Sequence, residues 1–252
     1  MSLHPEPSTL SRQTPAYTIS VVSHGQAALV RRLLADLERL PPNTFEVVLT
    51  LNIPEDESSL LTGKLPLRVI RNAVPKGFGA NHNAAFAASL GTYFIVVNPD
   101  VRLPDLCLDE LRRVVDEGRT GACAPAVVNG HGQLEDSARR LPTLGRLLRR
   151  VVLRDRSLDY VWRDEPQEVD WVAGMFIVFR REAFVQARGF DERRFFMYFE
   201  DVDLCDRLHK LGWAVRVQPA VRVVHDAQRA SRTSLKHLQW HLTSAVRYLT
   251  GL

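Results

Sequence analysis

Apolar residues along this chain occur in two patterns, short continuous runs and runs with helical spacing. Continuous apolar runs bounded by turn residues are typical of buried strands, and apolar positions at i, i+3, i+4 and i+7 are typical of helices. The continuous runs predict strands over Tyr17–Val22, Phe45–Leu51, Leu67–Ile70, Tyr93–Val97, Ala122–Val128, Glu168–Phe179, Ala214–Val217 and Val221–Val224. The spaced runs predict helices over Gln26–Leu40, Gly79–Leu90, Asp105–Glu117, Asp201–Leu211 and Ser231–Leu249.

Strands that alternate with helices indicate an α/β fold, with a mainly parallel, Rossmann-like central sheet and helices on both faces. In such sheets, ligands bind at the carboxyl ends of the strands. Polar residues stand at four of these predicted ends, namely His24, Asn52, Asn72 and Asp100. The sequence therefore places a candidate site along one edge of the sheet.

The 252 residues are 45% hydrophobic and 25% charged, which suits one globular domain. We expect this domain to span residues 16–230, with a C-terminal helix over 231–252 packed on it or extending it. Residues 1–15 are polar and contain three prolines, so we expect a disordered tail. They contain no apolar core of a signal peptide.

Three widely spaced cysteines, Cys107, Cys123 and Cys205, indicate a reducing compartment and no cysteine-based metal site. The longest apolar run, Trp171–Phe179, is shorter than the ~20 residues that span a bilayer. We therefore expect a cytoplasmic protein.

Positive charge is concentrated in one segment. Arg139–Arg156 holds seven arginines against Asp155 alone, so the net charge of +4 leaves −2 on the rest of the chain. A single basic segment argues against a general nucleic-acid binder and for a local anionic partner.

Within this segment, an amphipathic helix is predicted around residues 144–152. We favour its contact with an anionic membrane, on the inner face of the cytoplasmic membrane, or with a lipid pyrophosphate acceptor. The alternative is a surface helix whose apolar stripe packs on the body of the protein. Its apolar stripe is Leu144, Leu147, Leu148, Val151 and Val152, and Arg146, Arg149 and Arg150 lie opposite.

Acidic residues follow an aromatic run, Phe195–Phe199, at the start of a predicted helix: Glu200, Asp201 and Asp203. A carboxylate at the mouth of an aromatic-walled pocket is poorly solvated, which makes it a candidate base or metal ligand. The alternative is that these carboxylates only cap the N-terminus of the helix, where anions are favoured.

Four motifs together resemble those of family 2 glycosyltransferases, and most closely the bacterial rhamnosyltransferase-like branch. The resemblance covers residues 17–225 and implies a GT-A fold, a nucleoside-diphosphate sugar donor, a divalent cation, and sugar transfer with inversion. The motifs are Asn98-Pro99-Asp100, Gly77-Phe78-Gly79 with Asn83, Gly189-Phe190-Asp191-Glu192, and the Phe199–Leu204 segment.

The resemblance assigns Asp100 to the metal motif, where a carboxylate and the donor phosphates hold Mg²⁺ or Mn²⁺. Asn98 stands where the common motif has an aspartate, which predicts weaker metal binding, and Asn-Pro-Asp is also good turn chemistry. His225 ends a predicted strand, where a histidine can complete the metal shell; a hydrogen-bonded structural histidine is the alternative.

The family's Glu-Asp pair assigns the general base to Asp201, with Glu200 beside it. Asp203 is expected on the acceptor side, as a structural residue or as the partner of an arginine. Trp171, Gly174 and Met175 lie on the strand that the family uses to wall the sugar and acceptor. Trp171 suits stacking on a sugar, although a tryptophan in such a run is more often part of the core.

The nucleotide is expected at the ends of the first strands and at the glycine-rich turn, whose following helix N-terminus favours phosphate. Leu51 replaces the family's base-contacting aspartate, which leaves open whether the donor carries thymidine or uridine. The expected contacts are Ser23, His24, Asn52, Asn72, Gly77, Phe78, Asn83 and Asn98.

The sequence therefore predicts an inverting glycosyltransferase that moves rhamnose, or a similar sugar, from a dTDP- or UDP-sugar to a cell-surface glycan or lipid-linked saccharide. One rival is a sugar-nucleotide nucleotidyltransferase, but Val22–Gln26 lacks the glycine-rich triphosphate loop of that class. A second rival is an inactive GT-A domain that binds a glycan or scaffolds an assembly. The terminal helix suits acceptor contacts or an oligomer contact equally.

Overall fold

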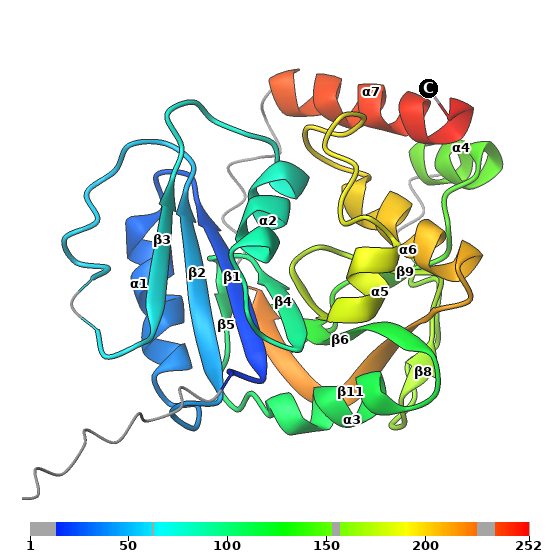
Figure 1. The fold of residues 1–252 in the computed structure, drawn as a ribbon. Helices are drawn as coiled ribbons and strands as arrows, with labels where there is room; N and C mark the ends of the chain where they lie inside the picture. The colour runs from blue at the N-terminus through cyan, green and yellow to red at the C-terminus, as the bar shows by residue number, and fades with distance from the viewer. Residues whose placement is uncertain (1–13, 62, 153–156, 226–234, 252) are drawn as a thin grey trace, which may run out of the picture.

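The computed structural model describes residues 14–61, 63–152, 157–225 and 235–251 (Figure 1). Nearly all of the predicted tail over residues 1–15, and the first four residues of the predicted terminal helix, lie outside these ranges. Within the described ranges, no helix is long and apolar enough to cross a membrane.

A nine-stranded mixed sheet forms the centre of the molecule, with strands in the order β3-β2-β1-β4-β10-β6-β11-β5 and β8 paired to β11. The first four strands are mutually parallel, β10 runs against β4 and β6, and β6 is parallel to β11. A separate pair joins β7 to β9. The strands are β1 (Tyr17–Ser23), β2 (Phe45–Leu51), β3 (Leu67–Arg71), β4 (Tyr93–Val97), β5 (Val101–Arg102), β6 (Thr120–Val128), β7 (Ala138–Arg139), β8 (Gln167–Glu168), β9 (Trp171–Val172), β10 (Phe176–Arg180) and β11 (Ala214–His225).

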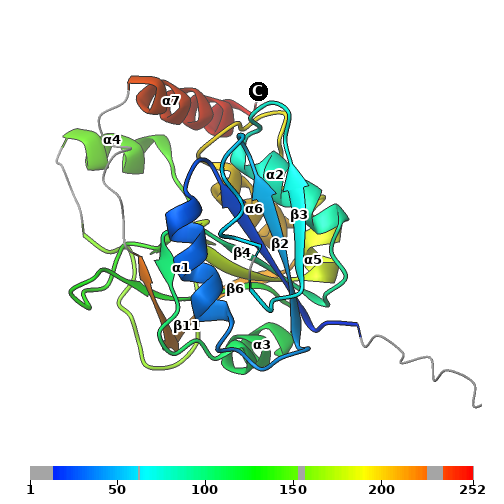
Figure 2. The same cartoon turned by 90° about the vertical axis from the view of Figure 1, so that its left-hand side faces the viewer.

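Helices cover both faces of the sheet (Figures 1 and 2). One apolar core packs α1 and α3 against one face, and a second packs α2, α5, α6 and part of α7 against the other. The predicted α/β fold with helices on both faces is therefore confirmed. The helices are α1 (Ala27–Leu37), α2 (Phe78–Ala87), α3 (Leu108–Asp116), α4 (Leu144–Val152), α5 (Arg181–Gln186), α6 (Glu200–Lys210) and α7 (Leu235–Thr250).

The predicted bounds of β2 and β4 are confirmed residue for residue, and the other predicted elements lie within a few residues of their expected places. The prediction of one strand over Glu168–Phe179 is wrong, because this run forms β8, β9 and β10 in succession. The carboxylate of Asp170 accepts hydrogen bonds from Leu141 N–H and from the Tyr160 hydroxyl. These bonds hold the chain between β8 and β9 away from either ladder.

The two short strands predicted over Ala214–Val217 and Val221–Val224 are one strand, β11, with a break in register between Gln218 and Arg222. Pro219 lies in this break, and a proline removes one ladder donor, which explains the irregularity. The short elements β5, β7 and α5 were not predicted.

Asp36 of α1 ties its helix to the sheet edge from a buried position. Its carboxylate accepts two hydrogen bonds from Arg102, at 2.6 and 2.7 Å, and one from Leu103 N–H at 3.0 Å. Burial acts to raise the pKa of this carboxyl, but the bonds from Arg102 and Leu103 outweigh it and hold the pKa below its usual value. The ionised form of Asp36 therefore stabilises the fold.

We predict that Asp36→Ala lowers the free energy of unfolding by about 2–4 kcal/mol at neutral pH, because it leaves Arg102 without its buried partner. The difference from wild type should shrink below about pH 4, where a carboxyl with a lowered folded-state pKa loses its stabilising effect. Urea unfolding across pH measures both effects. Glu110→Ala removes an exposed ion pair with Arg113 on α3 and should change stability by less than about 0.5 kcal/mol. Equal losses in the two variants would contradict this account.

Candidate active site

A three-residue segment between β9 and β10, Ala173–Met175, makes hydrogen bonds both to the residue that follows β4 and to the first turn of α6. Met175 carbonyl oxygen accepts a hydrogen bond from Asn98 N–H at 2.9 Å. One residue earlier, Gly174 N–H donates to Asp201 Oδ2, also at 2.9 Å. The segment that follows β4, which carries Asp100, and the helix that carries Asp201 are thus fixed to the same short piece of backbone.

Asp201 lies in the first turn of α6 and receives two backbone hydrogen bonds, one from Gly174 and one from Val202 at 2.8 Å. Burial raises the pKa of this carboxyl above its usual value, and the backbone bonds oppose that rise. A raised pKa moves a carboxylate toward the range of an effective general base at neutral pH. A β-carbon on Gly174 would lie 3.0 Å from the Phe78 ring, so glycine allows this close approach.

Two consecutive residues before α6 adopt left-handed backbone conformations, Tyr198 with φ 71° and Phe199 with φ 68°. Left-handed conformations in residues other than glycine cost about 1–3 kcal/mol each and persist only where surrounding contacts enforce them. The Tyr198 hydroxyl lies 2.8 Å from His237 Nδ1 of α7, and the Phe199 ring packs against His241 and Tyr248 of the same helix. Helix α7 therefore holds the turn that presents Asp201.

Glu200, next to Asp201, is 6% exposed, and its Oε2 atom is buried without a hydrogen-bond partner. Burial, together with the neighbouring negative charge of Asp201, raises the pKa of Glu200 to about 8. This burial and the neighbouring charge favour the protonated form of Glu200.

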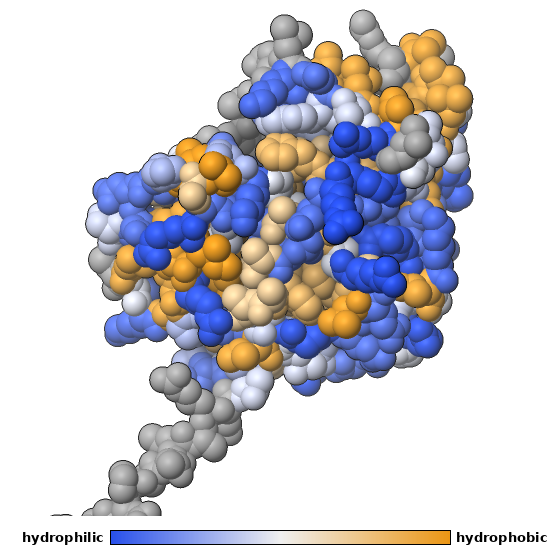
Figure 3. Space-filling model, turned by 45° about the horizontal axis from the view of Figure 1, so that its top comes forward, coloured by the Kyte–Doolittle hydropathy of each residue, from blue (hydrophilic) through white to orange (hydrophobic). Residues whose placement is uncertain are grey.

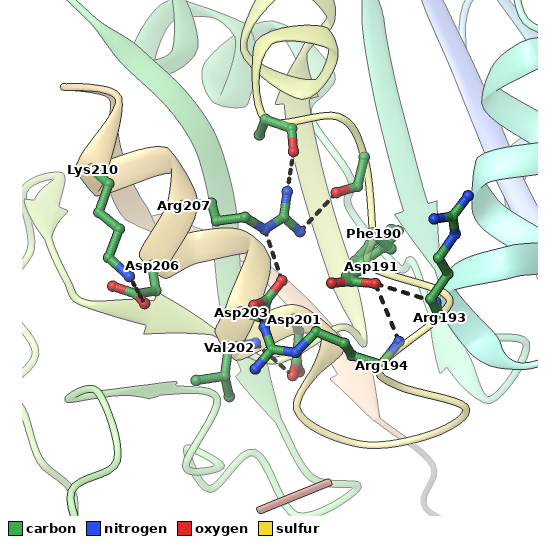
Figure 4. Close-up of polar contacts among 12 residues, drawn as sticks. Phe190, Asp191, Arg193, Arg194, Asp201, Val202, Asp203, Asp206, Arg207 and Lys210 are labelled. Carbon is green, nitrogen blue, oxygen red and sulfur yellow. Dashed lines mark hydrogen bonds and ion pairs between the residues drawn. The ribbon is translucent and has the colours of Figure 1, made fainter. Parts of the chain in front are cut away.

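Asp203 is held between two arginines, as Figure 4 shows. Arg194 lies 3.1 Å from Oδ1 and Arg207 lies 2.7 Å from Oδ2, and Arg207 also donates to the carbonyl oxygens of Ala187 and Gly189. Both carboxylate oxygens are occupied. Of the roles expected for Asp203, this geometry favours the partner of an arginine, which fixes α6 to the loop before it.

Asp100 and His225 come together at the sheet edge with a third residue, Glu135. His225 Nε2 lies 3.3 Å from Asp100 Oδ2, and Nδ1 lies 2.7 Å from Glu135 Oε2. Burial acts to lower the pKa of His225, but the hydrogen bonds and charges of the two carboxylates outweigh it and raise the pKa to about 9. Asp100 Oδ1 is buried without a partner. In the part of the chain that the structure describes, no three such side chains are arranged as a ready metal site.

The three asparagines Asn52, Asn72 and Asn81 form one buried network beyond β2 and β3. Asn72 Nδ2 donates to Asn52 Oδ1 at 2.9 Å and to Asn81 Oδ1 at 2.7 Å. Asn52 also binds the N–H and the carbonyl oxygen of Lys76, and its Nδ2 lies 3.1 Å from His24 Nδ1. The network fixes the loop that leads into the glycine-rich turn.

Gly77, Phe78 and Gly79 begin α2 against the loop that contains Phe196. Phe78 N–H donates to Phe196 carbonyl oxygen at 3.0 Å, and a β-carbon on Gly77 would lie 2.4 Å from that oxygen. Glycine is therefore needed for this contact. The Phe78 ring makes edge contacts with His82 and Phe190, so it forms part of the wall beneath the turn.

Asn83 bonds both backbone groups of Phe190, donating to its oxygen at 2.8 Å and accepting from its N–H at 3.0 Å. Ser23 Oγ accepts Gln26 N–H at 3.1 Å and so supports the start of α1. Trp171 is 9% exposed, lies in the core, and donates from Nε1 to Arg140 carbonyl oxygen. For Trp171 the structure favours the core alternative over sugar stacking.

The structure brings most of the expected residues to one edge of the sheet and adds two that sequence reasoning missed. Glu135 belongs to a loop with no motif, and only the fold places it against His225. Asn81 carried a signal, because Asn81-His82-Asn83 is a polar run inside an alanine-rich helix. His82 is 1% exposed, lies 2.8 Å from Ser20 Oγ, and has its pKa lowered to about 3 by burial, so it is a neutral core residue.

Two comparisons of sequence bear on this site. Residues 18–186 match the model of the family described as Glycosyl transferase family 2. The N-acetylglucosaminyl-diphospho-decaprenol L-rhamnosyltransferase of Mycobacterium tuberculosis is 31% identical over 94% of this chain and 84% of its own length. Rhamnosyltransferase WbbL of Escherichia coli is 29% identical over 92% of this chain and 91% of its own.

Solved structures support the fold. GalNAc-T7, solved with UDP, GalNAc and Mn²⁺, superposes with a TM-score of 0.66 at 15% identity over 85% of this chain, which spans 44% of that structure. The mannosyltransferase PcManGT of Pyrobaculum calidifontis, solved with GDP-Man and Mn²⁺, gives a TM-score of 0.61 at 18% identity over 92% of this chain and 64% of its own. The predicted GT-A fold is confirmed. The family match and the identity to a rhamnosyltransferase over almost the whole chain show that this protein is a glycosyltransferase and belongs to glycosyl transferase family 2.

Proposed function

We propose that this enzyme transfers rhamnose, or a closely similar sugar, from a dTDP- or UDP-sugar to a lipid-linked saccharide or cell-surface glycan, with inversion at the anomeric carbon. Asp201 acts as the base. The acceptor hydroxyl attacks the anomeric carbon, its proton passes to Asp201, and the bond to the nucleoside diphosphate breaks as the new glycosidic bond forms. Two relatives named as rhamnosyltransferases support the sugar. The diphospho-decaprenol in the name of the Mycobacterium tuberculosis relative supports a lipid-linked acceptor.

The observation that carries this proposal is the pair of backbone bonds at Ala173–Met175. One bond holds the Asp201 carboxylate at Gly174, and the other holds Asn98, which follows β4, at the adjacent Met175. A base must be held within reach of the proton it takes, and preorganised geometry supplies much of the rate in such displacements. Burial raises the pKa of Glu200 and so favours its neutral form, which reduces the charge repulsion on Asp201.

Asp100 and His225 are the residues that we propose to hold Mg²⁺ or Mn²⁺. The fit rests on the unpartnered, buried Oδ1 of Asp100 and on an imidazole nitrogen 3.3 Å from its other oxygen, from which the cation would have to displace a proton. Two protein ligands suffice where the phosphates of the donor supply the rest. The bound cation would neutralise the negative charge that develops on the departing diphosphate.

The asparagine network and the glycine-rich turn are proposed to hold the nucleotide through backbone shape. The polar atoms of Asn52 and Asn72 are engaged with each other and with Lys76, so these side chains act by fixing the loop. Phe78 N–H is taken by Phe196 carbonyl oxygen, and the N–H groups of Gly79 and Ala80 that follow it in the first turn of α2 suit a diphosphate. Asn83 holds the Gly189–Glu192 turn in place beside them.

We predict that Asp201→Asn lowers kcat about a thousandfold while donor binding changes less than about twofold, because the amide keeps the shape and loses the basic oxygen. Product formation from the sugar nucleotide and titration calorimetry measure the two effects. Asp206→Asn is the matched control on α6, since Asp206 pairs with Lys210 near the surface, and it should retain activity within about twofold. Full activity in Asp201→Asn would remove Asp201 from the mechanism.

We predict that a nucleoside diphosphate raises the melting temperature, that Mn²⁺ increases this shift, and that Asp100→Ala abolishes the increase. A ligand that binds only the folded state stabilises it by mass action. A panel of dTDP, UDP, GDP and CMP, each with and without Mn²⁺, also identifies the donor base. The exposed Asp105 supplies the control Asp105→Ala, for which the metal effect should persist. Persistence of the metal effect in Asp100→Ala would contradict the assigned site.

We predict that Glu200→Gln becomes progressively more stable than wild type as the pH rises from about 5 to 8. A carboxyl whose pKa is raised in the folded state binds a proton that the unfolded chain releases, so wild-type stability falls through this range by up to about 1.4 kcal/mol per pH unit. Glutamine has no proton to lose. Chemical unfolding at several pH values measures the difference, and a gap that stays constant with pH would refute the buried neutral Glu200.

A further inference from the structure

Helix α7 has an exposed apolar face in addition to the face that packs onto the body of the protein. At about 100° per residue, Ser244 and Ala245 lie on the face that packs onto the body, where both are buried. Leu238, Leu242 and Val246 form a second face at i, i+4 and i+8, and each is more than half exposed. The packed face is therefore accounted for, and the apolar face is additional to it.

Helix α4 repeats this arrangement. Leu147 is partly buried against the core, whereas Leu144, Leu148 and Val152 are 63%, 54% and 72% exposed. The predicted amphipathic helix is thus present. Among the stripe residues whose side chains the structure describes, the alternative in which the stripe packs on the body holds for Leu147. Three side chains of the stripe face outward.

The two helices lie next to each other at the same end of the molecule in both ribbon views (Figures 1 and 2). Figure 3 turns this end toward the viewer and shows apolar surface gathered there beside hydrophilic surface. We define the apolar strip as Leu144, Leu148, Val152, Leu238, Leu242 and Val246. Six large apolar side chains on adjacent helices are more than scattered surface residues, and patches of this kind mark interaction sites.

The charged residues of the two helices themselves have one sign. The sequences of α4 and α7 contain Arg146, Arg149, Arg150, Lys236 and Arg247, and no aspartate or glutamate. Arg150 is occupied by Asp136 and Asp159, and Arg247 bonds the backbone of Arg194. Arg146 is exposed on the side of α4 opposite its apolar stripe, and Lys236 is exposed on α7. An apolar face on helices that carry only cations complements a bilayer with anionic headgroups.

We propose that α4 and α7 together form a docking surface for an anionic phospholipid bilayer, with the apolar strip entering the interface and the basic residues meeting the headgroups. A polar partner or one of mixed charge fits this surface less well, because the strip has no hydrogen-bonding groups and the charged residues of the two helices are all basic. The proposal concerns lipid binding and does not depend on the transfer chemistry.

The same surface is joined to the candidate active site. Helix α7 makes two further contacts besides those to Tyr198 and Phe199. The ring centroids of Phe196 and Trp240 lie 5.0 Å apart, and the Ser244 hydroxyl donates to Met197 carbonyl oxygen. Docking through α7 would therefore bring the loop before Asp201 close to the bilayer. This is the orientation in which a lipid-linked acceptor can be reached.

Sedimentation with phosphatidylcholine vesicles, with and without phosphatidylglycerol, tests the proposal on the full chain. Wild type should bind the anionic vesicles and bind much less to pure phosphatidylcholine. Leu242→Ser/Val246→Ser should weaken binding about tenfold, because two half-exposed apolar side chains no longer enter the interface. Arg146→Gln/Lys236→Gln should weaken binding to anionic vesicles roughly twenty-five-fold, at about fivefold per charge.

Leu90→Ser/Val185→Ser is the matched control. It changes one leucine and one valine that are 57% and 56% exposed, against 58% and 57% for Leu242 and Val246, and neither lies on α4 or α7. This control should bind as wild type does, and thermal unfolding should show that all variants are folded.

Three results would overturn the proposal. The first is a wild-type protein that does not bind anionic vesicles, and the second is an equal loss in the strip variant and the control. The third is a wild-type dimer that ignores vesicles and dissociates in Leu242→Ser/Val246→Ser, which would assign the strip to self-association. Because the readout is lipid binding, none of these results bears on whether the enzyme transfers a sugar.

Discussion

The candidate site depends on two backbone hydrogen bonds made by neighbouring residues of one short segment. Gly174 N–H holds the Asp201 carboxylate, and Met175 carbonyl oxygen holds Asn98 at the end of β4. Both bonds use backbone atoms of the segment, so the course of its backbone, and not the type of its side chains, sets where Asp201 and Asn98 lie. The glycine is the exception, since a β-carbon would crowd the Phe78 ring. Through this segment the separate strands and helix of the sheet edge become one rigid site.

The fold and the motifs could be predicted from the sequence to different depths. Continuous apolar strands such as β2 and β4 were predicted with correct bounds, because burial on both faces leaves a plain signal. The apolar run after Glu168 gives no sign that it forms three separate strands. Strand pairing breaks at Asp170 and Gly174, although the residues around them remain apolar. Asn52 and Asp100 could be placed at strand ends. Asn81, which accepts a hydrogen bond from Asn72, lies in α2, and Glu135, which lies 2.7 Å from His225, lies in a distant loop. Only the fold brings these two residues to the strand ends.

Helix α7 contacts the turn before α6 on one side and contributes to the apolar strip on the other, two features with no evident link in the sequence. Its inner face enforces the left-handed turn at Tyr198 and Phe199, from which α6 begins, and so contributes to the position of Asp201. Its outer face continues the apolar strip of α4. A helix that fixes the base on one side and meets lipid on the other would place chemistry next to the membrane without any change in the sheet. The basic segment found in the sequence is thus half of a surface whose other half is α7.

The measurement that tests the account most directly is a crystal structure of the protein grown with a nucleoside diphosphate and Mn²⁺, with the metal located by its anomalous scattering. The account predicts one manganese peak bound by Asp100 and His225, the diphosphate beside the start of α2, and the Asp201 carboxylate open toward the space where the sugar would lie. A nucleotide bound at another edge of the sheet, or a manganese ion held without Asp100, would contradict it.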